Sequence, residues 1–174
     1  MAFASAGKPF LERRMNRKER RAAQKRRQGG AIQGAGVSGG GMRSYGSMTY
    51  AGFKSMLYAG VAKDDPRIVA AYDWIRRYWR LDSNPNMPTA QSKEGLFYYY
   101  MVFARALQAL GRDEIPDFRD QSIKHNWRGE LVAQLAQLVQ PNGSWANEAD
   151  RWNEGSPTLV TCYAVMALED ALKK

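Results

Sequence analysis

The feature that most constrains the fold of this chain is an alternation between two kinds of helix-forming segment. Residues 47–61, 94–110 and 157–172 are apolar on nearly every side of a helix, whereas the segments beginning at Pro66 and Trp127 have one polar face. A helix that is apolar all round must be buried all round, and an amphipathic helix packs through one face only. The alternation therefore predicts an all-α protein with two layers, in which five helices alternate between inner and outer positions.

Local signals predict where these helices begin and end. Asp65 is a capping acid before Pro66, and proline is favoured at the first helical position. Asn126 and Ser156 are the corresponding cap residues of the last two helices, and Gly111 is a typical residue just after a helix end. The connections 82–90 and 112–124 show no strand pattern and are expected to be irregular.

A short turn joins the last two helices. Leu131, Leu135 and Leu138 form the apolar face of the helix that leads to Gln140, and the sequence Pro-Asn-Gly then ends it. Trp145 follows as a large apolar anchor with one N–H donor. The stretch from Gln140 to Trp145 is therefore expected to clasp two consecutive helices together.

The spacing Leu-x3-Leu-x4-Gln-x2-Gly-x-Trp resembles the QW repeat of the squalene–hopene cyclase and protein prenyltransferase β-subunit superfamily, whose fold is an α/α toroid. The helix starts Gly46-Ser47-Met48-Thr49 and Ser156-Pro157-Thr158 are also similar to inner-helix starts of that superfamily. The resemblance covers roughly residues 45–172 and implies a partial toroid, about half a ring. It also implies that Gln140, Gly143 and Trp145 form a structural clasp rather than a catalytic group.

The chemistry of that superfamily has no counterpart in the motifs of this chain. The cyclases protonate their substrate with a D-x-D-D motif, which is absent, and Asp64-Asp65 is explained by helix capping. The prenyltransferases hold zinc with Asp, Cys and His, whereas this chain has only Cys162 and His125. Catalytic zinc normally needs three protein ligands. We therefore expect no metal and no cofactor, interpret Cys162 as a small buried apolar residue, and leave open whether the chain is an enzyme.

Aromatic side chains on the three apolar helices are the candidates for lining a ligand groove. They either fill the core or border a pocket, and buried tyrosine hydroxyls need hydrogen-bond partners in both cases. Three consecutive tyrosines, 98–100, point in three directions on a helix, so they cannot all line one cavity. Arg151, Trp152 and Glu154, in the loop before the last helix, either rim such a pocket or clasp the loop. The candidate groove residues are Tyr50, Tyr98, Tyr99, Phe103, Thr161 and Tyr163.

The positive charge of the chain is concentrated in its first 30 residues, which hold ten Lys or Arg and two Glu, while the whole chain carries +9. Residues 29–41 hold seven glycines, which is typical of a flexible linker. We expect residues 1–41 to be a disordered basic arm and 42–174 to be the helical domain. The first reading of the basic run is a solvated tail. Residues 8–27 are also candidates for weak binding of an anionic polymer or lipid, and a transit-type sequence is the third reading.

Three functions fit these features. The first is a binding module with an apolar, aromatic-lined groove for isoprenoid-like ligands and without cyclase activity of its own. The second is a fragment or subunit of a cyclase- or transferase-like enzyme completed by another chain. The third is a scaffold whose basic arm binds nucleic acid or anionic lipid. Apolar helices at the open edges of a half toroid also predict a homo-oligomer or a missing partner. A cytoplasmic location is expected, because no signal peptide or transmembrane segment is recognisable.

Overall fold

The computed structural model describes residues 44–173, and the predicted basic arm, 1–41, lies outside the described residues. The described part is all-α apart from one short hairpin. Its elements, in chain order, are α2 (Gly46–Tyr58), α3 (Pro66–Arg77), α4 (Leu96–Leu110), β1 (Glu114–Pro116), β2 (Lys124–Asn126), α5 (Trp127–Leu138) and α6 (Pro157–Leu172), with 3₁₀ turns at Thr89–Gln91 and Arg151–Asn153.

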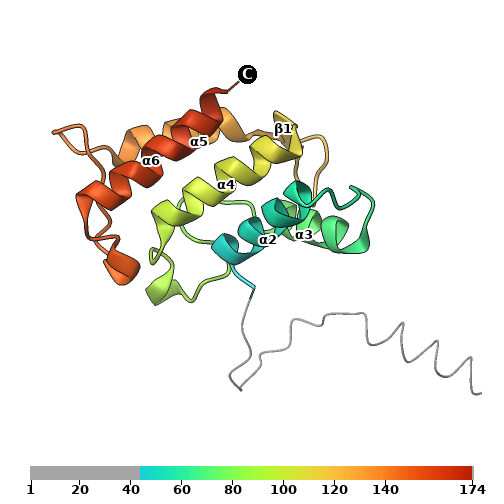
Figure 1. Cartoon of the computed structure of the whole chain (residues 1–174), viewed down its shortest axis with the longest axis horizontal. Helices are drawn as coiled ribbons and strands as arrows, with labels where there is room; N and C mark the ends of the chain where they lie inside the picture. The colour runs from blue at the N-terminus through green and yellow to red at the C-terminus, as the bar shows by residue number, and fades with distance from the viewer. Residues whose placement is uncertain (1–43, 174) are drawn as a thin grey trace, which may run out of the picture. The chain divides into compact units, whose positions relative to one another are not determined.

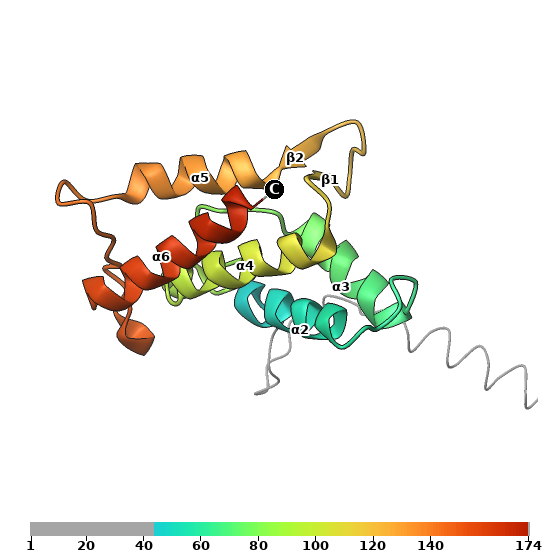
Figure 2. The same ribbon diagram turned by 45° about the horizontal axis from the view of Figure 1, so that its top comes forward.

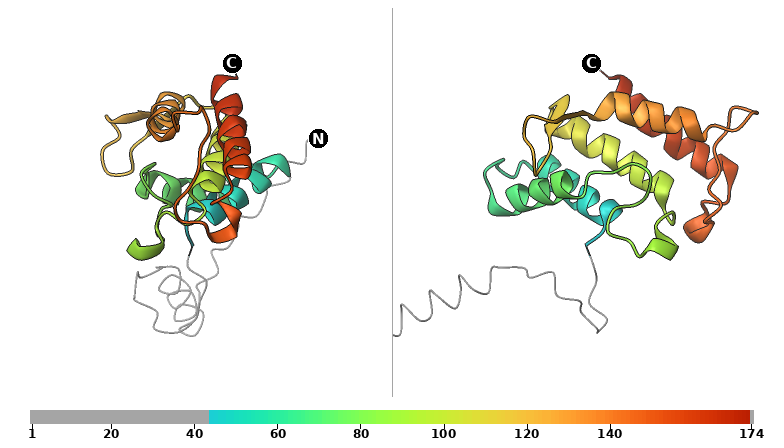
Figure 3. Two further views of the ribbon diagram at one scale, coloured as in Figure 1. Left: turned by 90° about the vertical axis from the view of Figure 1, so that its left-hand side faces the viewer. Right: turned by 180° about the vertical axis from the view of Figure 1, so that it is seen from behind.

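The helices form two layers. Helices α2, α4 and α6 lie side by side and run in the same direction, with α4 between the other two (Figure 1). Helix α3 packs against α2, and α5 packs against α6 and α4, both on the same side of the three-helix layer (Figure 2). The end-on view in Figure 3 separates the two layers most clearly. The apolar segments thus form one layer and the amphipathic segments the other, as the alternation in the sequence predicts.

Most of the predicted helix ends are confirmed. The side chain of Asp65 accepts a hydrogen bond from the backbone N–H of Arg67, and that of Asn126 accepts one from Gly129. Gly111 ends α4 in the left-handed conformation with a φ of 71°. The side chain of Ser156, in contrast, makes no capping hydrogen bond, so α6 begins with proline at its first position and no side-chain cap.

The connection after α4 differs from the prediction, because it contains a small antiparallel hairpin. Ile115 pairs with His125 across the two strands and is completely buried. Lys124 and Glu114 form an ion pair 3.1 Å long on the exposed side of the hairpin. Strands of three residues, with one buried side chain in β1 and none in β2, are too short to produce an alternating pattern, which explains why the sequence did not indicate them.

The core is an aromatic cluster between the two layers. Phe103 of α4 lies at its centre, with ring centroids 5.1 Å from Tyr50, 5.3 Å from Trp79, 5.8 Å from Tyr99 and 6.2 Å from Trp127. The hydroxyl of Tyr99 donates to the carbonyl of Arg80 at 2.8 Å. The hydroxyl of Tyr50 is buried and has no hydrogen-bond partner among the described residues.

The outer flanks of the three-helix layer are exposed. On α2 the side chains of Met48 and Tyr58 are 49% and 64% exposed, and on α6 those of Val165 and Leu172 are 52% and 72% exposed. Cys162 of α6 is exposed as well, so its interpretation as a small buried residue was wrong. The reason is that α6 is the last helix of its layer, and the described residues provide no further helix to cover that flank.

Asp170 carries a negative charge at the contact between α4 and α6. It is 3% exposed and accepts hydrogen bonds from Arg105 at 2.8 Å and from Lys173 at 2.9 Å. Burial on its own raises the pKa of Asp170, but the hydrogen bonds from Lys173 and Arg105 outweigh it and lower the pKa below its usual value.

A carboxylate whose pKa is lower in the folded than in the unfolded protein stabilises the fold at pH values above its unfolded-state pKa, which is near 3.9 for Asp. This stabilisation is lost as the pH falls through the pKa of the folded state. Asp170→Asn should therefore lower the free energy of unfolding by about 1–3 kcal/mol at pH 7. The difference between the two proteins should shrink as the pH falls below about 4. Urea titrations at pH 7 and pH 3 measure the difference in the free energy of unfolding between the two proteins. An equal difference at both pH values would show that the charge of Asp170 does not stabilise the fold.

Candidate functional site

A well-enclosed pocket lies where α2 and α4 begin. Its volume is about 380 Å³, and its lining is mostly apolar. Because α2, α4 and α6 run in the same direction, their first turns meet at the same end of the layer, and the loop before α6 closes one side. The lining residues are Tyr45, Ser47, Met48, Gly95, Tyr98, Trp152, Glu154 and Tyr163.

Glu154 is the only acidic residue that lines this pocket, and it is only 1% exposed. Its carboxylate accepts hydrogen bonds from the backbone N–H groups of Phe97 at 3.2 Å and Tyr98 at 2.8 Å. The side-chain amide of Asn147 donates a third, at 2.7 Å. Glu154 thus caps the first turn of α4 from 57 residues further along the chain, where the partial positive charge of the helix N-terminus favours a carboxylate.

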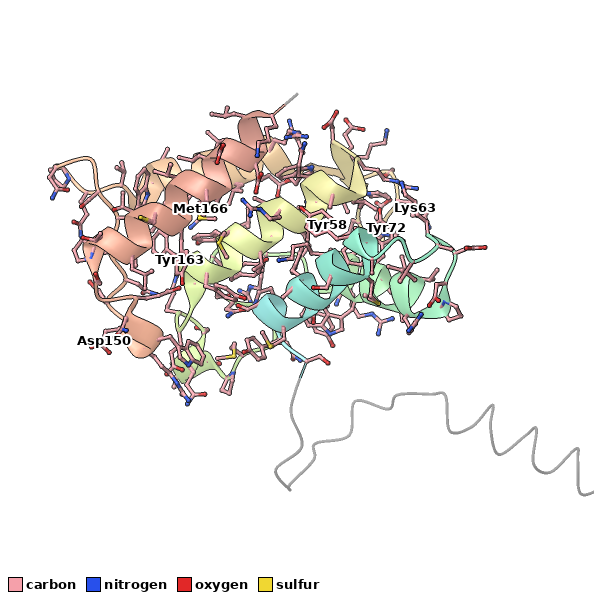
Figure 4. All side chains as sticks on the ribbon, in the orientation of Figure 1. Tyr58, Lys63, Tyr72, Asp150, Tyr163 and Met166 are labelled. Atoms are coloured by element: carbon pink, nitrogen blue, oxygen red, sulfur yellow. The ribbon has the colours of Figure 1, made fainter. Side chains whose placement is uncertain are left out.

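The loop that carries Glu154 has an unusual backbone. Trp152 and Asn153 both have left-handed conformations, with φ values of 59° and 63°. Two consecutive non-glycine residues of this kind store strain, which is found most often at functional sites and switch regions. The ion pair between Arg151 and Glu94, 3.0 Å long, ties the loop to the segment before α4. Asp150, at the start of this loop, is labelled in Figure 4.

Trp152 forms the outer wall of the pocket and is 53% exposed. Its ring lies directly on the backbone of Gly95, where a Cβ atom would come within 3.0 Å of the indole. Gly95 also has a φ of 64°. The glycine therefore serves two purposes, since it allows the turn into α4 and leaves room for the tryptophan.

Two of the six candidate groove residues border the pocket. Tyr98 and Tyr163 meet there edge to face, with ring centroids 5.8 Å apart, and Figure 4 labels Tyr163 between α6 and α4. Burial, followed by the charge of Glu154 and the neighbouring Tyr98, raises the pKa of the Tyr163 hydroxyl. The Glu154 carboxylate is thus close enough to this part of the pocket to contribute negative charge there.

The other four candidates lie elsewhere. Tyr50, Tyr99 and Phe103 are at most 1% exposed and belong to the core rather than to a groove. The hydroxyl of Thr161 accepts a hydrogen bond from the backbone N–H of Trp145 at 3.1 Å and so belongs to the clasp. All four lie on apolar helices. Apolarity alone does not distinguish the helix face that contacts the second layer from the face that lines the pocket.

The sequence did not single out Tyr45, Ser47, Met48 or Gly95 as pocket residues. A signal for Ser47 and Met48 was present, because Gly46-Ser47-Met48-Thr49 resembles the start of an inner helix. The sequence pattern did not indicate that the inner helices run in the same direction, which brings their first turns to the same end of the layer. Trp152 and Glu154 had been considered both as a pocket rim and as a loop clasp, and they occupy both positions.

The clasp is built mainly by Trp145. Its indole N–H donates to the carbonyl of Leu135 at 2.9 Å. Gln140 stays within its own turn, where its backbone carbonyl accepts from Gly143 at 2.8 Å and its side chain accepts from the hydroxyl of Ser144 at 3.1 Å. Gly143 has a φ of 81°, which suits glycine at this point of the turn.

A second polar cluster holds the hairpin against the outer layer. The indole N–H of Trp79 donates to Glu130 at 2.8 Å, and the ring of His125 stacks on Trp79 with centroids 4.6 Å apart. The two ring nitrogens of His125 lie 3.2 Å from Glu130 and 3.6 Å from Asp117. Within residues 44–173, no three His, Cys, Asp or Glu side chains are grouped so that they could hold a metal ion.

A larger hollow of about 690 Å³ lies beside this cluster, between the end of α3 and α5. It is open to solvent, and most of its lining is polar, including Arg77, Arg80, Asp82 and Gln134. Such a surface encloses little of a small molecule, whereas ligand pockets usually bury most of the ligand behind an apolar lining. The pocket at Tyr98 and Trp152 is therefore the better candidate site.

Comparison of the chain with protein-family models, with curated proteins and with solved structures gives no match. The resemblance to the α/α-toroid superfamily thus rests on the sequence features described above. In the part of the chain that the structure describes, no helix is long and apolar enough to cross a membrane.

Proposed function

We propose that this chain is a binding module of the squalene-cyclase and prenyltransferase repeat type, which holds an apolar, isoprenoid-like molecule and has no cyclase activity of its own. The observation that carries the proposal is the pocket of about 380 Å³ whose walls include Tyr98, Tyr163, Trp152 and Met48. Its volume is within the usual range of ligand pockets, and its lining combines apolar side chains with a few polar groups.

The side chains around the pocket support binding rather than catalysis. Glu154 is the only carboxylate in the lining, and three hydrogen bonds already fix its position. The D-x-D-D motif with which the resembling cyclases protonate their substrates is absent from the sequence. The aromatic rings supply a wide, rigid contact surface, which suits a branched apolar chain.

Titration calorimetry with geraniol, a neutral ten-carbon isoprenoid alcohol, tests this proposal. We expect one saturable site per chain, and Trp152→Ala should weaken binding about tenfold, which corresponds to about 1.4 kcal/mol of lost contact. Tyr58→Ala is the matched control, because Tyr58 ends α2 on the far side from the pocket and is exposed. Absence of saturable binding, or equal losses in the two variants, would refute the proposal.

A second proposal concerns the exposed flank of α6. Cys162, Val165 and Leu172 are exposed and lie along one helical stripe, at the end of a layer that the described residues leave open. We propose that this flank pairs with a second copy of the chain or with a chain that completes the toroid. Pairing would cover apolar side chains that soluble proteins seldom leave exposed as one patch.

Sedimentation velocity at several protein concentrations tests the pairing. We expect a dimer that Val165→Glu converts to a monomer, since a charge opposed to an apolar face is costly to bury. Val69→Glu, at a comparably exposed valine on α3, should leave the dimer intact. A monomer at every concentration would contradict self-association.

The anionic-polymer site predicted at residues 8–27 lies outside the described residues and remains a separate proposal.

A further inference from the structure

We propose that the pocket is selective for a cation, so that its preferred ligand combines an apolar body with an ammonium-type head group. This inference rests on the proposed function and names the class of ligand. Three observations support it. A buried carboxylate has no cationic partner among the described residues, nearby helix N–H groups already donate hydrogen bonds, and several aromatic rings line the pocket.

The carboxylate of Glu154 has no cationic partner among the described residues. Its hydrogen bonds come from two backbone amides and one side-chain amide, all of them neutral donors. Arg151, the nearest cation in the loop, instead pairs with Glu94. The N-terminus of α4 offsets about half of one charge. A buried negative charge is usually paired, so a cation in the pocket would complete the compensation.

Four backbone N–H groups near the pocket that would attract an anion are already hydrogen-bonded. The backbone N–H groups of Phe97 and Tyr98, in the first turn of α4, both donate to Glu154. In the first turn of α2, the N–H of Gly46 donates to the carbonyl of Pro85 and that of Ser47 donates to Asn84. A helix N-terminus binds anions through free N–H groups, and these four are not free.

Four aromatic side chains line the same pocket as the carboxylate. Tyr45, Tyr98, Trp152 and Tyr163 all line the pocket, and the faces of such rings attract cations within about 6 Å. The guanidinium of Arg151 already lies 4.8 Å from the centre of the Trp152 ring at the rim. A cage of several rings with one carboxylate is the arrangement that recognises ammonium groups.

Three probes with the same ten-carbon body test the inference, namely geranylamine, geraniol and geranic acid, which are cationic, neutral and anionic at pH 7. Calorimetry on the full chain should give geranylamine about tenfold tighter binding than geraniol. This is about 1.4 kcal/mol, a value between those of an exposed and of a desolvated cation–π contact. Geranic acid should bind more weakly than geraniol. A salt concentration of about 0.15 M screens long-range interactions between charges at the protein surface and the probes.

Two variants of Tyr163 separate the cation effect from apolar burial. Tyr163→Leu keeps an apolar side chain but removes the ring, so the preference for the amine should fall to about threefold while geraniol still binds. Tyr163→Phe keeps the ring and should keep the preference. Glu154→Gln removes the charge and should also reduce the preference. Because Glu154 caps α4, circular dichroism must first show that this variant is folded, and the Tyr163 pair carries the test independently.

The outcomes distinguish the inference from the function on which it rests. Equal affinities for geranylamine and geraniol would leave the ligand-binding function intact and overturn cation selectivity. Binding of none of the three probes would overturn both. A preference for the amine that survives both Tyr163→Leu and Glu154→Gln would place the cation outside this pocket and overturn the inference alone.

Discussion

Trp145→Ala is expected to lower the free energy of unfolding by about 3–5 kcal/mol, as truncation of a buried tryptophan usually does. The side chain is only 9% exposed, so its removal leaves a cavity between α5 and the start of α6. The indole N–H also donates to the carbonyl of Leu135, one of the last four carbonyls of α5, which a helix leaves unpaired at its end. The variant therefore loses both packing and a helix cap.

Denaturant unfolding followed by circular dichroism measures this loss. Trp152→Ala is the matched control, because Trp152 is 53% exposed and its removal should cost less than about 1 kcal/mol. A domain of this kind is typically stable by about 5–15 kcal/mol, so the Trp145 variant should have a clearly lower unfolding midpoint. A change below about 1 kcal/mol for Trp145 would mean that it does not clasp the two helices.

Phe103→Ala should be comparably destabilising, by about 3–5 kcal/mol. Phe103 is completely buried at the centre of the aromatic cluster, and four other rings lie around it. Since it does not border the pocket, the fraction of the variant that remains folded should bind geraniol with unchanged affinity. This behaviour distinguishes a core residue from a groove residue.

Thermal unfolding and calorimetry on the same sample test both parts of that prediction. Tyr58→Ala, which truncates an exposed aromatic side chain on α2, should change stability by less than about 0.5 kcal/mol. If Phe103→Ala weakened geraniol binding without a loss of stability, Phe103 would have to line the groove, as the sequence had suggested.

Secondary structure was predictable here because local chemistry determines it. The caps at Asp65 and Asn126 and the left-handed Gly111 lie where the sequence indicates them, and α6 spans the predicted residues. The layer assignment followed from hydrophobic pattern alone, since a helix without a polar face has to be an inner helix. The small hairpin was missed because its pairing joins residues 8 to 12 positions apart that show no repeating pattern.

The candidate site was only partly predictable. On α4 all faces are apolar, so periodicity cannot show that Tyr98 faces the pocket while Tyr99 and Tyr100 direct their hydroxyls to the carbonyls of Arg80 and Leu81. The directions of these tyrosine side chains depend on how the neighbouring helices pack against α4. The role of Glu154 as a cap of α4 could not be predicted either, because its hydrogen-bond partners on α4 are 56 and 57 residues away in the sequence.

The most direct test of the proposed binding site is a two-dimensional amide and indole NMR titration of the chain with geraniol. The proposal predicts that the Trp152 indole signal and the amides of Gly95, Tyr98 and Tyr163 shift together and saturate at one ligand per chain. The indole signals of the buried Trp127 and Trp145 should move little. Shifts confined to the exposed flank of α6, or no saturable shifts, would contradict it.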